Sequence, residues 1–237
     1  MMQNNEQVSP EQISPLFFIL CGPTGSGKTD ISYKMAEQFP FEIVNGDTGQ
    51  CYEPLTIGTA KPIWKNHPVT HHLFDSISEP RYFSVTEYRD RMQNIMQDIW
   101  QRKKIPLIVG GSLFYIRSLF WPPYLASSYV KTSEDNEAGF VPSEVEGQDL
   151  WQQLYEIDPA RAQAIDKHDR YRIERALIIW HTTGQKPSEQ KPIYQPLGQQ
   201  SLGQQSLVKF FLTYVTRDRQ ELYDRINQRT HLMMEQG

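Results

Sequence analysis

The chain has 237 residues, of which 38% are hydrophobic and 22% are charged, with 16 prolines and 14 glycines. This composition excludes a coiled coil, a collagen-like repeat and a wholly disordered chain, and the length allows one large domain or one domain with an appendage. The formal net charge of −4 creates no global basic field, which by itself argues against a nucleic-acid-binding protein.

The two cysteines, Cys21 and Cys51, form no CxxC pair and cannot build a disulfide framework. We therefore expect a reduced, cytoplasmic setting. The early apolar run at 16–21 is far shorter than the roughly 20 residues that a membrane span needs. It also follows a polar leader without basic residues, so we expect neither a signal peptide nor a membrane helix.

The first part of the chain has the pattern of a βαβ unit. Residues 1–15 are polar and contain prolines, which predicts a flexible N-terminal arm. The continuous apolar run at 16–21 predicts a strand that is buried on both faces. Apolar residues at helical spacing predict a helix over 29–39, which Pro40 ends, and a second strand follows at 41–44. Two strands joined in this way form a parallel pair.

A second helix–strand pair follows further along the chain. Ser84 is predicted to cap a helix over 85–99, with Glu87 in the register of a capping box. Another buried strand is predicted at 105–109, and a short apolar helix at 112–120. These elements add a further strand to the same parallel sheet.

The composition changes after Trp121, where serine, acidic residues and glycine become frequent. Helical patterns resume later and predict helices at 150–157, 159–165 and 170–182. One more strand, at 208–215, and a final helix, at 219–235, follow. Together with the motif G-x-x-x-x-G-K-[ST] at 22–29, this order of elements predicts an α/β fold, a P-loop NTPase-like parallel sheet flanked by helices, with a small, mainly helical inserted segment. The predicted parts are an arm at 1–15, a core at 16–121, an insertion at 122–165 and the second part of the core at 166–237.

A phosphate-binding loop joins the first strand to the first helix. Its residues fit the pattern G-x-x-x-x-G-K-[ST] between a strand and a helix, which is the context that this motif requires. Backbone amides and the helix N-terminus favour phosphate oxygens, the lysine adds a cation, and the Thr29 hydroxyl can ligate Mg²⁺. The predicted diphosphate- or nucleotide-binding residues are Gly22, Pro23, Thr24, Gly25, Ser26, Gly27, Lys28 and Thr29.

Asp47 follows the second strand, at the sheet edge where parallel α/β proteins place ligands. A carboxylate there can act as a general base or as an outer-sphere partner of magnesium, and the alternative is an ordinary helix cap or turn residue. His71 and His72 lack the further ligands that a zinc site needs. Cys51 is interpreted as a small packing residue rather than a nucleophile.

Seven ordered motifs resemble those of the tRNA dimethylallyltransferases. The resemblance extends from about residue 16 to the chain end and rests on the segments GPTGSGKT, DTGQCY, IGTAKP, HHLFD, FSVTEY, VGGSLFYIRSL and DRYRIERAL. It implies transfer of a dimethylallyl group from dimethylallyl diphosphate to the exocyclic amine of the adenine 3′ of the anticodon in tRNA. It further implies Mg²⁺ as cofactor and the tRNA anticodon stem-loop as partner. Members of this family generally continue beyond the equivalent of Gly237, so we expect a chain shortened at its C-terminus. We also expect the protein to act as a monomer.

The resemblance also assigns roles to residues. Lys28 and Thr29 would hold the diphosphate and the metal, Asp47 would take the proton of the adenine amine, and Ser112 would donate its hydroxyl toward the departing diphosphate. Arg219, together with Arg225 and Arg229 of the late helix, would offer a contact to diphosphate or RNA. The residues implied in tRNA binding are Asp47, Thr48, Gly49, Gln50, Tyr52, Tyr171, Arg172, Ile173, Glu174 and Arg175.

Other interpretations stay open. Arg172 and Arg175 share a helix face that could equally be a solvated basic surface paired with Asp169 and Glu174. The core motifs would also suit an adenylate isopentenyltransferase that acts on free nucleotides, a small-molecule P-loop kinase that binds ATP, or an inactive binding remnant. Against the kinase, residues 122–149 contain one basic residue, Lys131, where such enzymes carry an arginine-rich lid.

Overall fold

A computed structural model describes residues 15–122, 149–197 and 208–236. The chain divides into two units, one formed by Met1–Phe120 with Gln195–Gly237 and the other by Trp121–Tyr194. The predicted arm, apart from its last residue, and most of the non-helical part of the predicted insertion lie outside the described residues.

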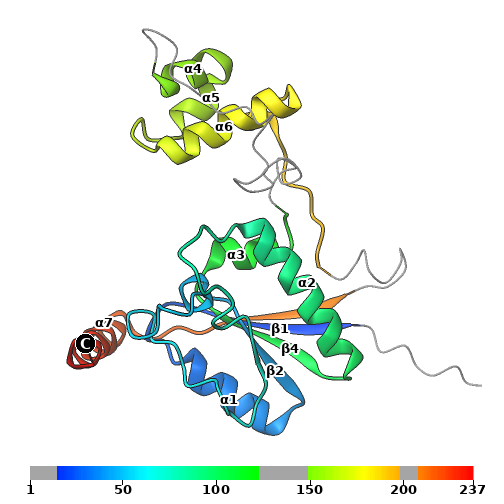
Figure 1. Ribbon diagram of the computed structural model, residues 1–237, viewed down its shortest axis with the longest axis vertical. Coiled ribbons are helices and arrows are strands. Elements are labelled where there is room, and N and C mark those ends of the chain that lie inside the picture. Colours follow the sequence, from blue (N-terminus) through cyan, green and yellow to red (C-terminus); the bar gives the residue numbers. More distant parts are fainter. Residues whose placement is uncertain (1–14, 123–148, 198–207, 237) are drawn as a thin grey trace, which may run out of the picture. The chain divides into compact units, whose positions relative to one another are not determined.

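The first unit is built on a five-stranded parallel sheet (Figure 1). Its order is β3-β2-β4-β1-β5, with the strands β1 (Leu16–Cys21), β2 (Phe41–Asn45), β3 (His71–His72), β4 (Ile105–Gly110) and β5 (Lys209–Tyr214). The α/β fold and the parallel sheet are thus confirmed. The strand β3 was not predicted, because two residues carry no periodic signal.

Helices cover both faces of this sheet, as the alternation of side chains along β1 shows. Phe17, Ile19 and Cys21 pack in one core cluster with α2 (Val85–Gln101) and α3 (Leu113–Ser118). Phe18 and Leu20 point the other way, into a cluster with α1 (Lys28–Gln38). Figure 1 shows α1 on one side of the sheet and α2 on the other. The predicted burial of this strand on both faces follows from this three-layer arrangement.

The predicted cap of α2 is confirmed, because the Ser84 hydroxyl oxygen accepts a hydrogen bond from the Glu87 amide at 3.1 Å. The Glu87 carboxylate, however, pairs with Arg81 at 2.6 Å and with Arg91 at 2.7 Å. The cap therefore holds the start of the helix, while Glu87 holds the preceding chain segment.

A close backbone contact joins the carboxyl ends of β2 and β4. A Cβ atom added at Gly110 would lie 2.1 Å from the carbonyl carbon and oxygen of Gly46. Only glycine fits at such a distance. This contact brings the segment after β2, which begins with the short 3₁₀ helix η1 (Thr48–Cys51), next to the end of β4.

The last elements of the first unit are exposed. The strand β5 pairs with β1 at the sheet edge, yet all six of its residues are exposed. The helix α7 (Arg219–Glu235) that follows has no buried residue. Among the described helices, none is long and apolar enough to span a membrane.

The second unit contains α4 (Leu150–Ile157), α5 (Pro159–Gln163), α6 (Arg170–Thr183) and the 3₁₀ helix η3 (Pro187–Glu189). An aspartate caps each α-helix: Asp149, Asp158 and Asp169 accept backbone amide hydrogen bonds at 2.7, 3.0 and 3.1 Å. Their apolar faces share one small core, so α6 belongs to this unit. The sequence placed the return to the core at residue 166, whereas this unit extends to Tyr194.

Candidate active site

The phosphate-binding loop lies between β1 and α1, as its sequence predicts. Gly27 has a φ of 94° and forms the N-cap of α1, a left-handed conformation that glycine adopts without strain. Within the loop, the Ser26 hydroxyl oxygen is buried and has no hydrogen-bond partner among the residues that the structure describes. A buried polar atom without a partner is costly, so a ligand that reaches this loop would find a group ready to bind it.

One cavity of the first unit brings together five of the predicted site residues, Thr24, Lys28, Thr29, Asp47 and Gln50. Its walls come from the phosphate-binding loop, α1, the segment after β2, the end of β4 and α7. Residues that line it include Thr24, Lys28, Thr29, Asp47, Gln50, Thr59, Ala60, His71, Gly110, Gly111 and Arg229. The structure therefore brings together the lysine, the threonine and the aspartate that the sequence singled out separately.

Lys28 is held over the phosphate-binding loop. Its ammonium group donates to the carbonyl oxygens of Gly22 at 3.0 Å and of Pro23 at 2.8 Å. Burial lowers the pKa of Lys28, and the Asp47 carboxylate acts in the opposite direction. A partly buried ammonium that is held only by neutral carbonyls gains from a nearby anion, which makes Lys28 a suitable diphosphate ligand.

Asp47 both caps a turn and lines the cavity. Its Oδ1 accepts a hydrogen bond from the Gly49 amide at 3.1 Å and caps η1, while the residue also lines the cavity. Buried Asn45 braces it: the side-chain oxygen accepts from the Asp47 amide at 2.8 Å, and the side-chain nitrogen donates to the Asp47 carbonyl at 2.8 Å. Sequence reasoning did not single out Asn45, although a polar residue that ends a buried strand was a usable signal.

Of the three arginines predicted on α7, Arg225 and Arg229 contact the site and Arg219 does not. Arg229 lines the cavity, and burial lowers its pKa while Asp47 opposes this shift. Arg225 donates to the Gly25 carbonyl at 2.7 Å, and Arg217 donates to the Ser26 carbonyl at 2.9 Å. Arg219 instead contacts Tyr223, with 3.0 Å between its Nε and the phenol oxygen. Because Arg225 and Arg229 are four residues apart, they share one helix face, from which Arg219 is rotated away.

Other residues predicted after β2 shape the loop itself. The Gln50 side-chain nitrogen donates to the Thr59 carbonyl at 3.0 Å. The Tyr52 hydroxyl donates to the Arg81 carbonyl at 2.8 Å, and the Tyr52 side chain packs against the core. Ser112 accepts a hydrogen bond from the Thr48 amide at 3.2 Å, which ties the start of α3 to η1. Gln50 lines the cavity, whereas Tyr52 and Ser112 act in the surrounding structure.

The cavity also offers oxygen atoms for a hard cation. The Thr29 hydroxyl and the Asp47 carboxylate line the same space, and Mg²⁺ prefers oxygen ligands and keeps several waters. Over residues 15–122, 149–197 and 208–236, no group of three or more His, Cys, Asp or Glu could hold a metal by itself. These residues therefore fit a magnesium ion that takes its remaining ligands from a phosphate group and water.

The histidines and Cys51 take part in packing. His72 contacts the Glu42 carboxylate at 2.7 Å, and the His71 ring nitrogen Nδ1 lies 2.7 Å from the Val69 carbonyl. Cys51 is fully buried, and burial raises the pKa of its thiol to about 12, which suits a packing residue rather than a nucleophile.

The α6 residues predicted to contact tRNA lie in the second unit. Tyr171 and Arg172 are exposed, and Arg172 pairs with Asp169 at 3.2 Å. Glu174 pairs with Arg170 at 2.7 Å. Ile173 was also predicted to bind tRNA, but it is only 2% exposed and packs in the core of the unit. Its side chain therefore holds α6 in place and offers no surface to an RNA.

Comparison with known proteins finds a matching family. The sequence model of the IPP transferase family matches residues 50–237. The tRNA dimethylallyltransferase of Bacillus subtilis strain 168 is 38% identical over an alignment of 226 residues, which covers 92% of this chain and 68% of that protein. The enzyme of the same name from Bacillus cereus ATCC 14579 is 36% identical and is covered to 67% of its length.

Solved structures show the same relationship. A eukaryotic dimethylallyltransferase acting on tRNA matches with a TM-score of 0.72 and 26% identity, over 94% of this chain and 54% of that one. A tRNA isopentenylpyrophosphate transferase from Staphylococcus epidermidis matches with a TM-score of 0.56 and 27% identity, over 94% of this chain and 70% of its own. With the family model covering most of its length, this chain belongs to the IPP transferase family.

Proposed function

We propose that this protein is a prenyltransferase that moves a dimethylallyl group from dimethylallyl diphosphate to tRNA. The acceptor is the exocyclic amine of the adenine 3′ of the anticodon. One observation carries the proposal: a carboxylate, Asp47, and two cations, Lys28 and Arg229, line the same cavity beside a phosphate-binding loop. Family membership supports the same reaction.

The proposed chemistry is a substitution at the allylic carbon. A bond forms between the adenine amine nitrogen and this carbon, the bond from carbon to the diphosphate oxygen breaks, and the diphosphate leaves with the electron pair. Lys28, Arg229 and the amides of the loop neutralise the charge that develops on the diphosphate. The Asp47 carboxylate takes one proton from the amine as the new bond forms.

Asp47 suits this role because contacts within the protein hold it in place. The hydrogen bonds with Asn45 and the contact to the Gly49 amide fix the backbone and one carboxylate oxygen. The second oxygen is then the proton acceptor. We further propose that Thr29 holds Mg²⁺, which when bound would stabilise the leaving diphosphate as a Lewis acid.

The second unit is proposed to grip the RNA. Tyr171 and Arg172 are exposed on α6, where an aromatic ring can stack on a base and a guanidinium can contact phosphates. Action as a monomer is part of this proposal. The buried, unpaired thiols of Cys21 and Cys51 suit the cytoplasm.

A label-transfer assay tests the proposal. The protein is incubated with radiolabelled dimethylallyl diphosphate, Mg²⁺ and unmodified tRNA, and we expect label in the tRNA. Asp47→Asn should reduce the rate by about 10²-fold or more, the size typical for loss of a general base. Asp98→Asn, which removes an exposed carboxylate on α2, is the matched control and should keep the activity. Absence of label with the unaltered protein would overturn the proposal.

The same assay separates the alternatives. Label in AMP rather than tRNA would indicate an adenylate isopentenyltransferase. Consumption of ATP without a prenyl donor would indicate a kinase. Binding of diphosphate in thermal melts without any transfer would indicate an inactive remnant.

A further inference from the structure

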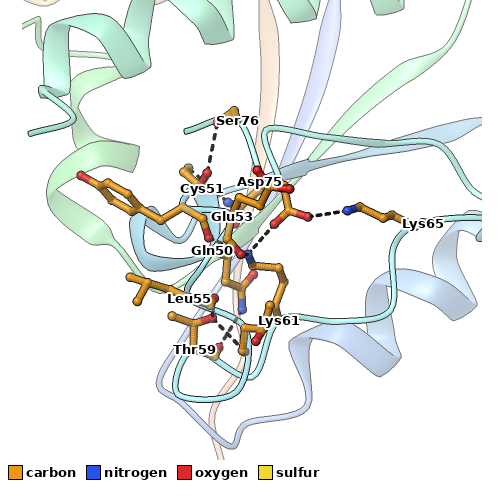
Figure 2. A network of polar contacts seen from close by, with 12 residues as sticks. Gln50, Cys51, Glu53, Leu55, Thr59, Lys61, Lys65, Asp75 and Ser76 are labelled. Carbon is orange, nitrogen blue, oxygen red and sulfur yellow. Dashed lines mark hydrogen bonds and ion pairs between the residues drawn. The ribbon is translucent and has the colours of Figure 1, made fainter. Parts of the chain in front are cut away.

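Lys61 is a buried cation close to the cavity but outside the site described above. Its side chain is only 4% exposed. The ammonium group donates to the carbonyl oxygens of Tyr52 at 2.6 Å and of Glu53 at 3.2 Å, and it forms an ion pair with the Asp75 carboxylate (Figure 2). All three hydrogens of the ammonium thus have an acceptor.

These contacts close a loop that runs from Asp47 to Lys61, here called the 47–61 loop. Asp75 acts on it twice, because its carboxylate binds Lys61 and its backbone amide donates to the Gln50 carbonyl at 3.3 Å. Gln50 in turn donates to the carbonyls of Thr59 and Ala60 at 3.0 and 3.4 Å. Figure 2 shows these residues gathered around the ion pair. Hydrogen bonds therefore connect residues 50–53 of the loop with its last residues, 59–61.

The backbone on both sides of the ion pair is strained. Ala60 has a φ of 44° and Asp75 a φ of 48°, values that non-glycine residues seldom adopt. Such conformations persist only where the surroundings over-determine them, and they cluster at functional sites. The contacts of Lys61 supply this constraint for the residue immediately before it.

A second lysine provides an internal comparison. Lys65 also pairs with Asp75, at 3.2 Å, but its side chain is 62% exposed. An exposed ion pair of this kind contributes little, because water screens it. A buried pair, in contrast, contributes little net stability over an apolar replacement but sets one arrangement of the chain. The geometry of Lys61 thus indicates a role in conformation rather than in overall stability.

We propose that Lys61 and Asp75 are positioning residues for the acceptor: their ion pair holds the 47–61 loop so that Asp47 and Gln50 face the cavity. This inference rests on the proposed function. It assigns Lys61 no contact with substrate, since its ammonium is occupied by the two carbonyls and the carboxylate. The diphosphate side of the cavity, formed by other elements, should work independently of this pair.

The experiment compares Lys61→Met with Lys65→Met in steady-state kinetics and in hydrogen exchange. We expect Lys61→Met to raise the KM for tRNA about tenfold, the size of one lost charge-assisted hydrogen bond, and to leave the KM for dimethylallyl diphosphate within about twofold. Amide exchange within 48–60 should rise about tenfold, while exchange in α2 stays unchanged. Lys65→Met should match the unaltered protein in every measurement.

A double variant separates positioning from stability. Lys61→Met leaves the Asp75 charge without its main partner, which lowers the melting temperature, and adding Asp75→Asn removes that charge. We expect the melting temperature to recover in the double variant while the KM for tRNA stays raised, because the carbonyls of Tyr52 and Glu53 remain unanchored. Recovery of the KM together with stability, or unchanged exchange in 48–60, would overturn the inference. Lack of transfer by the unaltered protein would instead overturn the proposed function. The exchange experiment would still test whether the Lys61–Asp75 ion pair holds the 47–61 loop.

Discussion

Two loops that line the cavity each contain a lysine that donates to backbone carbonyls, but the two lysines differ in whether a carboxylate neutralises their charge. In the phosphate-binding loop and in the 47–61 loop, a cation donates to backbone carbonyls. Among the described residues, the Lys28 ammonium donates to the Gly22 and Pro23 carbonyls and to no carboxylate, so its charge is left for a ligand. The charge of Lys61 is cancelled by Asp75 inside the protein. A lysine that donates to backbone carbonyls can therefore bind a ligand or stabilise a loop. Which of the two it does depends on whether a carboxylate of the protein already pairs with it.

The largest expected effect comes from the cation that remains available. Lys28→Met should lower prenyl transfer by about 10²- to 10³-fold, because a preorganised charge at the leaving group is lost. Lys34→Met removes an exposed lysine from the same helix and should have little effect. Single-turnover rates with labelled donor measure both variants, and equal rates for the two would refute the assignment of Lys28.

The next effect distinguishes the arginines of α7. Arg229→Gln should weaken diphosphate binding about tenfold, whereas Arg219→Gln should change it by about twofold at most, since only Arg229 lines the cavity. Titration calorimetry with inorganic diphosphate and Mg²⁺ measures the two affinities. The reverse order would favour the assignment made from the sequence alone.

A smaller effect concerns the attachment of α7. Arg225→Gln removes the hydrogen bond to the Gly25 carbonyl, which we expect to weaken diphosphate binding about threefold through a less ordered loop and helix. The same titration measures this. If the affinity stayed unchanged while exchange in the loop rose, the tether would serve stability alone.

The smallest effect is on the acid side of the stability profile. Burial opposes ionisation of Asp75, but the hydrogen bonds from Lys61 and Lys65 outweigh it and lower the pKa below the usual 3.8. The stabilisation from a lowered pKa is complete above the unfolded value and is lost as the pH falls through the folded one. Asp75→Asn should therefore cost stability at pH 6 and progressively less below pH 3.8, as measured by urea unfolding. A difference that is constant with pH would contradict the ion pair.

Most elements were predictable because their signals are local. The run at 16–21, the glycine pattern at 22–29 and the Ser84 cap each specify structure over a few residues, and the strands and helices follow them closely. The boundary of the second unit was not predictable in the same way. Helical spacing predicts α6 but does not tell which apolar partners its face will meet, and these proved to be α4 and α5.

The sequence by itself determined the parallel α/β core, the phosphate-binding loop and the carboxylate at the end of the second strand, because each depends on short-range periodicity or on glycine conformation. Only the tertiary structure decided which arginine reaches the cavity and that Lys61 is cancelled by Asp75. These two residues are 14 positions apart, and their pairing depends on a strained backbone and on burial. Charge in a sequence indicates what a residue can bind, whereas the fold determines whether that charge is still free.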